Sequence, residues 1–197
     1  MCNELPLDEL RALVERQRAY APLREGGSKG QKELGVLQDL LASLESSGHR
    51  GYFDPRLAPH DPPDCTLRIA GGSLAAVEVT EFVSQRAVEI NEGTRRHLKR
   101  RPDITEMVMA QWNAPGFLAH LDAILAMKDR VTLKGGPYQE VAVIIFEDEP
   151  LLVREQCERW LDDHTFHSFN QLTHGFFLFS YDPSTEGYPY RRLFGAA

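Results

Sequence analysis

Residues 62–80 have the sequence PPDCTLRIAGGSLAAVEVT, in which two short apolar runs flank Gly71, Gly72 and Ser73. Side chains of a strand alternate between its faces, and directly opposed residues of an antiparallel pair share a face. With residues 71–73 as the loop, residue 70 opposes residue 74 and Asp64 opposes Thr80. The segment therefore predicts a hairpin that carries Asp64 and Glu78 on one face.

The distribution of polarity along the two runs supports this register. One face receives only apolar side chains, namely Leu67, Ile69, Ala75, Val77 and Val79. The other receives Asp64, Thr66, Arg68, Glu78 and Thr80, and only Leu74 is out of place. A loop one residue shorter would move Asp64 to the face opposite Glu78. The prediction of a shared acidic face depends on that register.

Length and composition indicate one ordinary globular domain. The chain has 197 residues, of which 42% are hydrophobic and 26% charged, so we expect a single domain over 1–197. No run approaches the roughly 18 apolar residues of a membrane span, and the amino terminus lacks the pattern of a secretion signal. The three cysteines lie far apart, which favours reduced thiols. These features predict a cytoplasmic protein without a membrane partner.

The net charge of -7 argues against a surface that binds nucleic acid all over. Local charge differs, because one dense basic run follows the hairpin. It contains Arg95, Arg96, Lys99, Arg100 and Arg101. This run is either a patch that contacts phosphates or the solvated end of a helix, and the sequence leaves both interpretations open.

The remaining pattern predicts a mixture of helices and strands. Helices are expected at 6–20, 31–45, 86–100, within 112–130 and at 151–162, with residues 26–30 (GGSKG) as a linker. Short strands are expected near 52–53, 176–181 and 190–194, and the run VAVIIF at 141–146 predicts a strand buried on both faces. This order predicts an α/β or α+β domain with a mixed sheet.

Two carboxylates on one face are suited to binding a divalent metal ion. Asp64 and Glu78 supply hard oxygen ligands, and the backbone carbonyl of Val79 is a third candidate ligand for Mg²⁺, with Mn²⁺ as its substitute. Hydrolysis of a phosphodiester needs an activated water and neutralisation of the charge that develops on the phosphoryl oxygens, and such an ion supplies both. A nearby lysine would support the same charge.

On these residues the chain resembles the PD-(D/E)XK nuclease superfamily, which has the restriction-endonuclease-like fold. The resemblance rests on Pro63, Asp64, the Glu78-Val79-Thr80 triplet and the order helix, three strands, helix, strand (α-β-β-β-α-β). It implies a nuclease-like core at 31–148, with an N-terminal helical extension at 1–30 and a C-terminal helix and strand extension at 149–197.

The resemblance also implies roles for individual residues. Asp64 and Glu78 match the metal ligands of the family, and Glu33 matches its helix glutamate. Thr80 departs from the pattern, because the family lysine belongs there. Lys128, on the apolar stripe of the predicted helix in 112–130, resembles a lysine that has moved to that helix in some branches. The implied protein is a Mg²⁺-dependent hydrolase that cleaves DNA, guided by the basic run.

Several alternatives stay open at this level. The chain is alternatively a non-catalytic binding or regulatory protein of the same fold, or a partner-binding domain that forms a homodimer through its aromatic C-terminal region. A second interpretation of Asp64 is a turn residue at the entry of a strand, and a second interpretation of Glu78 is an exposed strand residue that pairs with Arg68. Lys128 alternatively extends to solvent from the helix end. Glu33 is alternatively a surface residue, with Asp39 in its place.

Overall fold

Three helices lie within the described part of the chain, and local sequence explains where two of them begin. The computed structural model describes residues 28–84, 87, 89, 110–147, 149, 151–180, 182 and 187–195. Helix α2 (Lys29–Ser46) begins after Ser28, whose hydroxyl accepts from Gln31 N, and α4 (Ala114–Lys128) begins after Asn113, whose side chain accepts from Gly116 N. The third helix is α5 (Arg154–Asp162).

The described strands form one six-stranded sheet with the order β1-β2-β3-β4-β5-β6. The strands are β1 (Tyr52–Leu57), β2 (Cys65–Ile69), β3 (Leu74–Phe82), β4 (Glu140–Glu147), β5 (His174–Leu178) and β6 (Tyr190–Phe194). The central strands β3, β4 and β5 are parallel, whereas β1, β2 and β6 pair antiparallel to their neighbours. The predicted α+β class with a mixed sheet is therefore confirmed.

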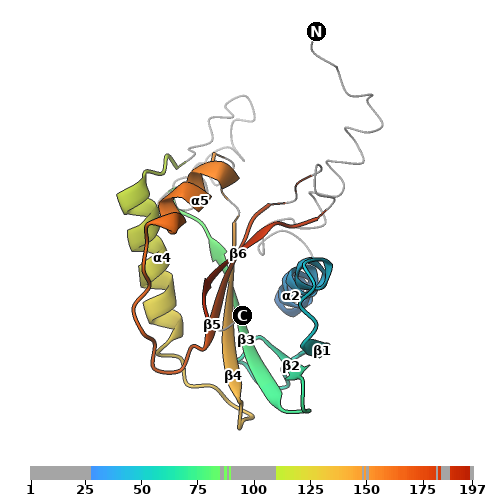
Figure 1. Cartoon of the computed structure of the whole chain (residues 1–197). Helices are drawn as coiled ribbons and strands as arrows, with labels where there is room; N and C mark the ends of the chain where they lie inside the picture. The colour runs from blue at the N-terminus through green and yellow to red at the C-terminus, as the bar shows by residue number, and fades with distance from the viewer. Residues whose placement is uncertain are drawn as a thin grey trace, which may run out of the picture.

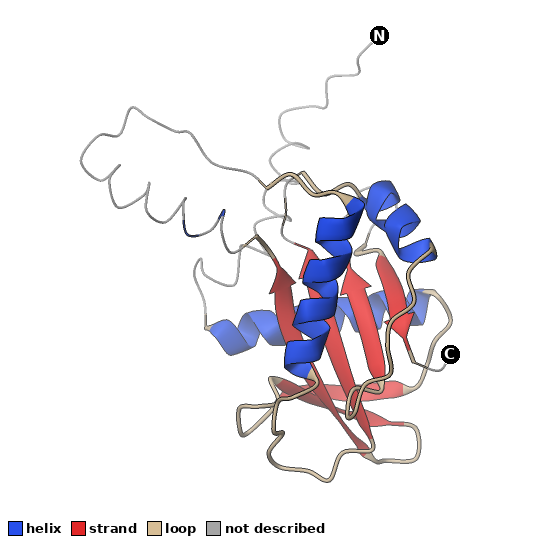
Figure 2. Cartoon of the chain, turned by 90° about the vertical axis from the view of Figure 1, so that its left-hand side faces the viewer, coloured by secondary structure: helices blue, strands red, loops and turns tan. Residues whose placement is uncertain are grey.

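The sheet is the middle of three layers. Figure 1 shows α2 on one side of the sheet and α4 with α5 on the other, and in Figure 2 α4 lies in front of the sheet and α2 behind it. Leu37, Leu40 and Leu44 of α2 pack on Val77 and Ile144. A second cluster joins both other helices to the opposite face, and its fully buried members include Phe117, Leu121, Leu125, Val143, Ile145, Cys157 and Phe177. Each such side chain contributes roughly 2 kcal/mol through burial.

The predicted register of the hairpin is wrong by two residues. In the structure Cys65 pairs with Val77 and Arg68 with Leu74, so the register continues toward Asp64 opposite Glu78 rather than opposite Thr80. The loop has the expected three residues but begins one residue earlier, because Ile69 N donates to Ser73 O and residues 70–72 lie between them. A shift of two residues preserves which side chains share a face. The predicted apolar face is accordingly buried under α2.

Most other predicted elements are present with adjusted ends. Strand β4 is buried and central as expected, and β6 has the predicted bounds. The strand expected near 52–53 runs on through Pro55 to Leu57, where it is an outer strand and tolerates proline. The predicted helix at 6–20, most of that at 86–100 and the basic run lie outside the described residues.

No helix in the part of the chain that the structure describes has both the length and the apolarity required to cross a bilayer. Cys65 and Cys157 are free thiols in the core, in agreement with the expectation of reduced cysteines.

Candidate functional site

Asp64 lies where the chain enters β2 and is held through both its backbone and its side chain. Ala58 N donates to the Asp64 carbonyl at 3.1 Å, and Val79 N on β3 donates to Asp64 Oδ2 at 2.8 Å. The residue is 9% exposed. The contact at Val79 is thus made by its N–H, whereas the sequence predicted a role for its carbonyl. Because Oδ2 is engaged with the backbone, Oδ1 is the oxygen available to other groups.

The loop before Asp64 is fixed by the segment that follows α4. Lys134 N donates to the Pro62 carbonyl at 2.9 Å, and Lys134 Nζ donates to the Asp61 carbonyl at 2.6 Å. Backbone hydrogen bonds of this kind hold a loop in one conformation. The site's aspartate is therefore positioned by a residue 70 positions later in the chain, which no local sequence signal reveals.

Glu78 is buried in β3 and paired with Lys128 of α4. Its residue exposure is 3%, and Lys128 Nζ lies 2.7 Å from Glu78 Oε2. Burial raises the pKa of Glu78, while the hydrogen bond and charge of Lys128 oppose the increase. Glu78 Oε1 is buried and has no hydrogen-bond partner. A buried carboxylate oxygen without a partner is costly, so this atom is suited to an additional cationic or donor ligand.

Hydrogen bonds of Asp129 and Gln171, here called the clamp, fix the end of α4 and thereby position Lys128. The Asp129 carboxylate accepts from the backbone N–H groups of Asn170, Gln171 and Leu172 at 2.9, 2.9 and 3.1 Å. Gln171 Nε2 in turn donates to the carbonyls of Lys128 and Val131. Burial opposes ionisation of Asp129, but these hydrogen bonds together outweigh it and hold its pKa below the usual range. The clamp stabilises the last turn of the helix that carries the ammonium.

Glu33 is reached by an ion pair that the sequence did not predict. Lys29 Nζ lies 3.1 Å from Glu33 Oε1, 3.5 Å from Asp64 Oδ1 and 3.9 Å from Asp61 Oδ2. Burial, and after it the negative charge of Asp64, raise the pKa of Glu33 to about 7 despite Lys29. The sequence predicts a linker at 26–30 and a helix from about Gln31, which leaves Lys29 outside the helix. A helix that begins at Lys29 gives the i,i+4 spacing with Glu33 that reveals the pair.

The three predicted acids surround the beginning of β2. Burial raises the pKa of the Cys65 thiol to about 12, and the charges of Asp64, Glu33 and Glu78 add to the increase. Asp64 is the middle member, because its charge raises the pKa of both Glu33 and Glu78. The tertiary structure thus brings carboxylates from α2, the entry of β2 and β3 into one electrostatic neighbourhood.

Two of the alternatives for single residues are wrong. Glu78 is not an exposed partner of Arg68, which instead contacts Asp54 and the Gly72 carbonyl near the hairpin turn. Glu33 is 4% exposed and is not a surface residue. Burial alone raises the pKa of Asp39 to about 7, so that residue shows no response to Asp64. Glu33 is therefore the α2 carboxylate that belongs to this site.

The donor set fits a divalent metal ion in its chemistry but is not gathered around one point. Within the described ranges, no three His, Cys, Asp or Glu side chains lie close enough together to hold a metal. Yet Glu78 Oε1 lacks a partner, and Asp64, whose side chain also interacts with Glu33, meets the mostly exposed Lys29 at 3.5 Å. Carboxylate oxygens of this kind suit Mg²⁺, which needs few protein ligands because it retains water. Asp64 and Glu78 are the residues that would hold it.

A second pair of buried acids lies at the ends of the parallel strands and has a structural role. Glu147 Oε1 accepts from Glu149 N at 3.0 Å, and Glu147 Oε2 accepts from the Ser180 hydroxyl at 2.5 Å. Glu149 accepts from the backbone N–H of Ser84. Because protein donors occupy these carboxylates, they join the ends of β3, β4 and β5.

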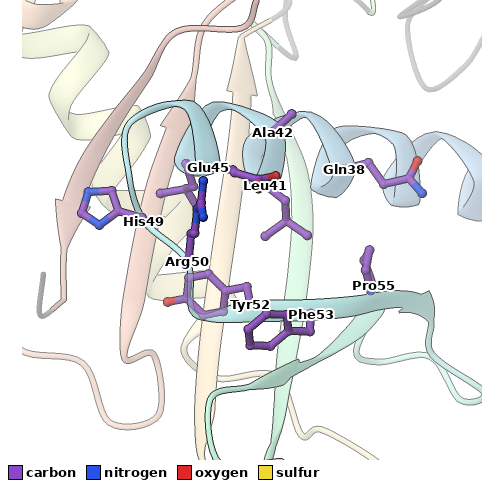
Figure 3. Close-up of a pocket in the computed structure, with 10 residues that line it drawn as sticks. Gln38, Leu41, Ala42, Glu45, His49, Arg50, Tyr52, Phe53 and Pro55 are labelled. Carbon is purple, nitrogen blue, oxygen red and sulfur yellow. The ribbon is translucent and has the colours of Figure 1, made fainter.

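A surface pocket of 390 Å³ lies between the C-terminal half of α2 and β1. Figure 3 shows the residues that line it. Its walls include Leu41, Glu45, Arg50, Tyr52 and Phe53. Glu33, Asp64, Glu78 and Lys128 do not line it. The pocket and the carboxylate site are therefore separate features of the molecule.

Comparisons of the chain with protein-family models, with curated proteins and with solved structures each gave no match. The function is therefore inferred from the residues and geometry of the site.

Proposed function

We propose that this chain is a metal-dependent nuclease-like protein with a restriction-endonuclease-like core, which hydrolyses phosphodiester bonds of DNA. The observation that carries the proposal is the 2.7 Å contact between Lys128 Nζ and Glu78 Oε2. The sequence lacks a lysine at Thr80, two residues after Glu78, and Lys128 brings an ammonium to the same carboxylate from another element.

The proposed division of roles follows from charge and burial. Asp64 and Glu78 provide the oxygens for Mg²⁺, which would activate water and neutralise charge on the phosphoryl group. Lys128 is 14% exposed at its side chain and places a fixed positive charge beside Glu78, where it would stabilise negative charge that develops on the substrate. Glu33 supports Asp64 from the α2 side of the site.

The direct test is cleavage of plasmid and short duplex DNA in the presence of Mg²⁺ or Mn²⁺. We expect cleavage by the wild type and a loss of about 100-fold or more in Asp64→Asn and in Glu78→Gln, because each removes a charged ligand. Glu155→Gln is the matched control, since Glu155 is an exposed acid on α5. Equal cleavage by the wild type and both site variants would reject the proposal.

One observation favours a second candidate, a non-catalytic DNA-binding or regulatory protein of the same fold. Lys29 already lies between Glu33 and Asp64, so the acids of the site are partly neutralised by the protein itself. Calorimetric titration with Mn²⁺ separates the candidates. Binding that disappears in Asp64→Asn and Glu78→Gln favours the enzyme, whereas the absence of binding in the wild type favours the regulatory protein.

A further inference from the structure

Lys29 lies between the buried carboxylates of Glu33 and Asp64. It is not part of the Asp64 or Glu78-Val79-Thr80 motif on which the resemblance to a nuclease rests. Its ammonium contacts oxygens of Glu33, Asp64 and Asp61, which come from α2 and from the loop before β2. Carboxylate oxygens, which make these contacts with the ammonium, are also the ligand type that a Mg²⁺ or Mn²⁺ ion prefers. The ammonium and a divalent ion would therefore compete for the same oxygens.

We propose that Lys29 is a resident cation of the carboxylate site, which a divalent metal ion displaces from Asp64 when Asp64 and Glu78 bind that ion. The inference rests on the proposed metal-dependent function, since it describes how the same site exchanges one cation for another. Lys29 would thereby set the affinity of the site for metal.

Burial shows which partner of the ion pair is able to leave. The side chains of Glu33 and Asp64 are each 5% exposed, whereas that of Lys29 is 64% exposed. A long exposed lysine side chain can turn its ammonium into water at little cost. The buried carboxylates cannot follow it, so departure of Lys29 leaves them in need of another cation.

The two lysines of the site differ in this respect. Lys128 has a side chain 14% exposed and contacts Glu78 at 2.7 Å, whereas Lys29 is mostly exposed and its nearest contact is 3.1 Å. The clamp at Asp129 and Gln171 also fixes the end of α4 below Lys128. Lys128 is therefore the fixed cation and Lys29 the exchangeable one.

The balance of charge agrees with an exchange. Asp61 is mostly exposed and screened by water, so the buried acids Glu33, Asp64 and Glu78 set the charge of the site. When ionised these three carry three negative charges, and the two lysines leave one of them uncompensated. A divalent ion in place of the Lys29 ammonium removes that remaining charge, whereas a divalent ion added beside Lys29 leaves an excess of positive charge. Like charges at close range repel strongly in a partly buried site.

The first experiment measures the affinity of metal-stripped protein for Mn²⁺ by calorimetry. We expect Lys29→Met to bind Mn²⁺ about tenfold more tightly than the wild type, because the competing ammonium is gone. Arg50→Met removes the same charge from the exposed segment between α2 and β1 and is the matched control, expected within about twofold of the wild type. Thermal unfolding in chelator checks that Lys29→Met is folded.

The second experiment measures whether the ammonium is released. Acetylation of Lys29 by an amine-reactive ester, followed by mass spectrometry, is expected to become about threefold faster at saturating Mn²⁺, because the amine loses its carboxylate partners. The rate in Asp64→Asn should not respond to Mn²⁺.

The outcomes distinguish this inference from the proposed function. If the wild type binds Mn²⁺ and Lys29→Met binds it no more tightly, or if Mn²⁺ leaves the reactivity of Lys29 unchanged, Lys29 is not displaced while the metal site stands. If neither protein binds Mn²⁺, both proposals are overturned. Tighter binding by Lys29→Met together with faster acetylation of the wild type supports the exchange.

Discussion

Lys128 Nζ lies 2.7 Å from Glu78 Oε2, although 50 residues separate the two along the chain. The contact crosses from α4 to the sheet and joins two side chains that are 14% and 4% exposed. Lys128 thereby supplies a positive charge beside the Glu78 carboxylate, which the uncharged side chain of Thr80 cannot provide. Several consequences of this arrangement are measurable.

Removal of the ammonium should reduce both stability and activity. Lys128→Met leaves the Glu78 carboxylate buried without its cation, and we expect the free energy of unfolding to fall by about 3 kcal/mol. The double variant Lys128→Met with Glu78→Gln should recover part of this loss, since no buried charge remains. Denaturant unfolding in a double-mutant cycle measures the coupling. Additive effects of the two substitutions would show that the pair does not interact.

Cleavage by the Lys128 variants tests the proposed role of the ammonium. We expect Lys128→Met to lose about 100-fold in kcat, and Lys128→Arg to retain more activity because it keeps the charge. Single-turnover assays of DNA cleavage give the comparison. Activity in Lys128→Met at the level of the wild type would mean that another group provides the charge.

A lysine at residue 80 should substitute in part for Lys128. Thr80 and Glu78 lie two residues apart on β3 and therefore share a face. We expect Thr80→Lys to raise the activity of Lys128→Met about tenfold but to reduce it in the wild type, where two ammoniums would repel each other. The same cleavage assay on the single and double variants measures the effect. A failure to raise activity in a folded double variant would contradict the prediction.

Loss of the Asp129 clamp should destabilise the protein and loosen Lys128. Asp129→Ala removes a carboxylate that accepts three backbone hydrogen bonds, and we expect a loss of about 2 kcal/mol. Because the folded pKa of Asp129 is depressed, its contribution is present above the unfolded pKa and is lost as pH falls through the folded value. Thermal unfolding at about pH 7 and about pH 3 should show a smaller difference between the proteins in acid.

Asp39 should make the stability of the protein depend on pH in the opposite direction. Burial raises the folded pKa of Asp39 to about 7, whereas its unfolded pKa is about 4. Ionisation of Asp39 therefore destabilises the folded state increasingly as pH rises from about 4 to about 7. We expect Asp39→Asn to gain about 2 kcal/mol at about pH 8 and almost nothing at about pH 4. Unfolding curves at the two values test this. An equal gain at both would assign the effect to something other than charge.

The alternation of side chains in 62–80 was sufficient to predict the hairpin and its two faces. It predicted the wrong partner for Asp64, because the three-residue loop comprises residues 70–72 rather than 71–73, which moves every pair by two residues. The prediction that Asp64 and Glu78 share a face was unaffected, since a shift of two residues leaves each side chain on the same face of its strand. The face on which each side chain lies was therefore predictable, whereas the pairing of individual residues depended on the position of the turn.

The sequence was sufficient to predict that Asp64 and Glu78 share a face of the hairpin and that Lys128 lies on the apolar stripe of a helix, and it left open whether Glu33 is a surface residue. Both predictions follow from the local periodicity of apolar side chains along the strands and the helix. The contacts of Lys128 with Glu78, of Lys134 with the loop before Asp64, and of Lys29 with Glu33 and Asp64 follow from the folded arrangement of the chain. Such contacts depend on how helices on opposite faces of the sheet pack against it, and long-range packing leaves no periodic signal in the sequence.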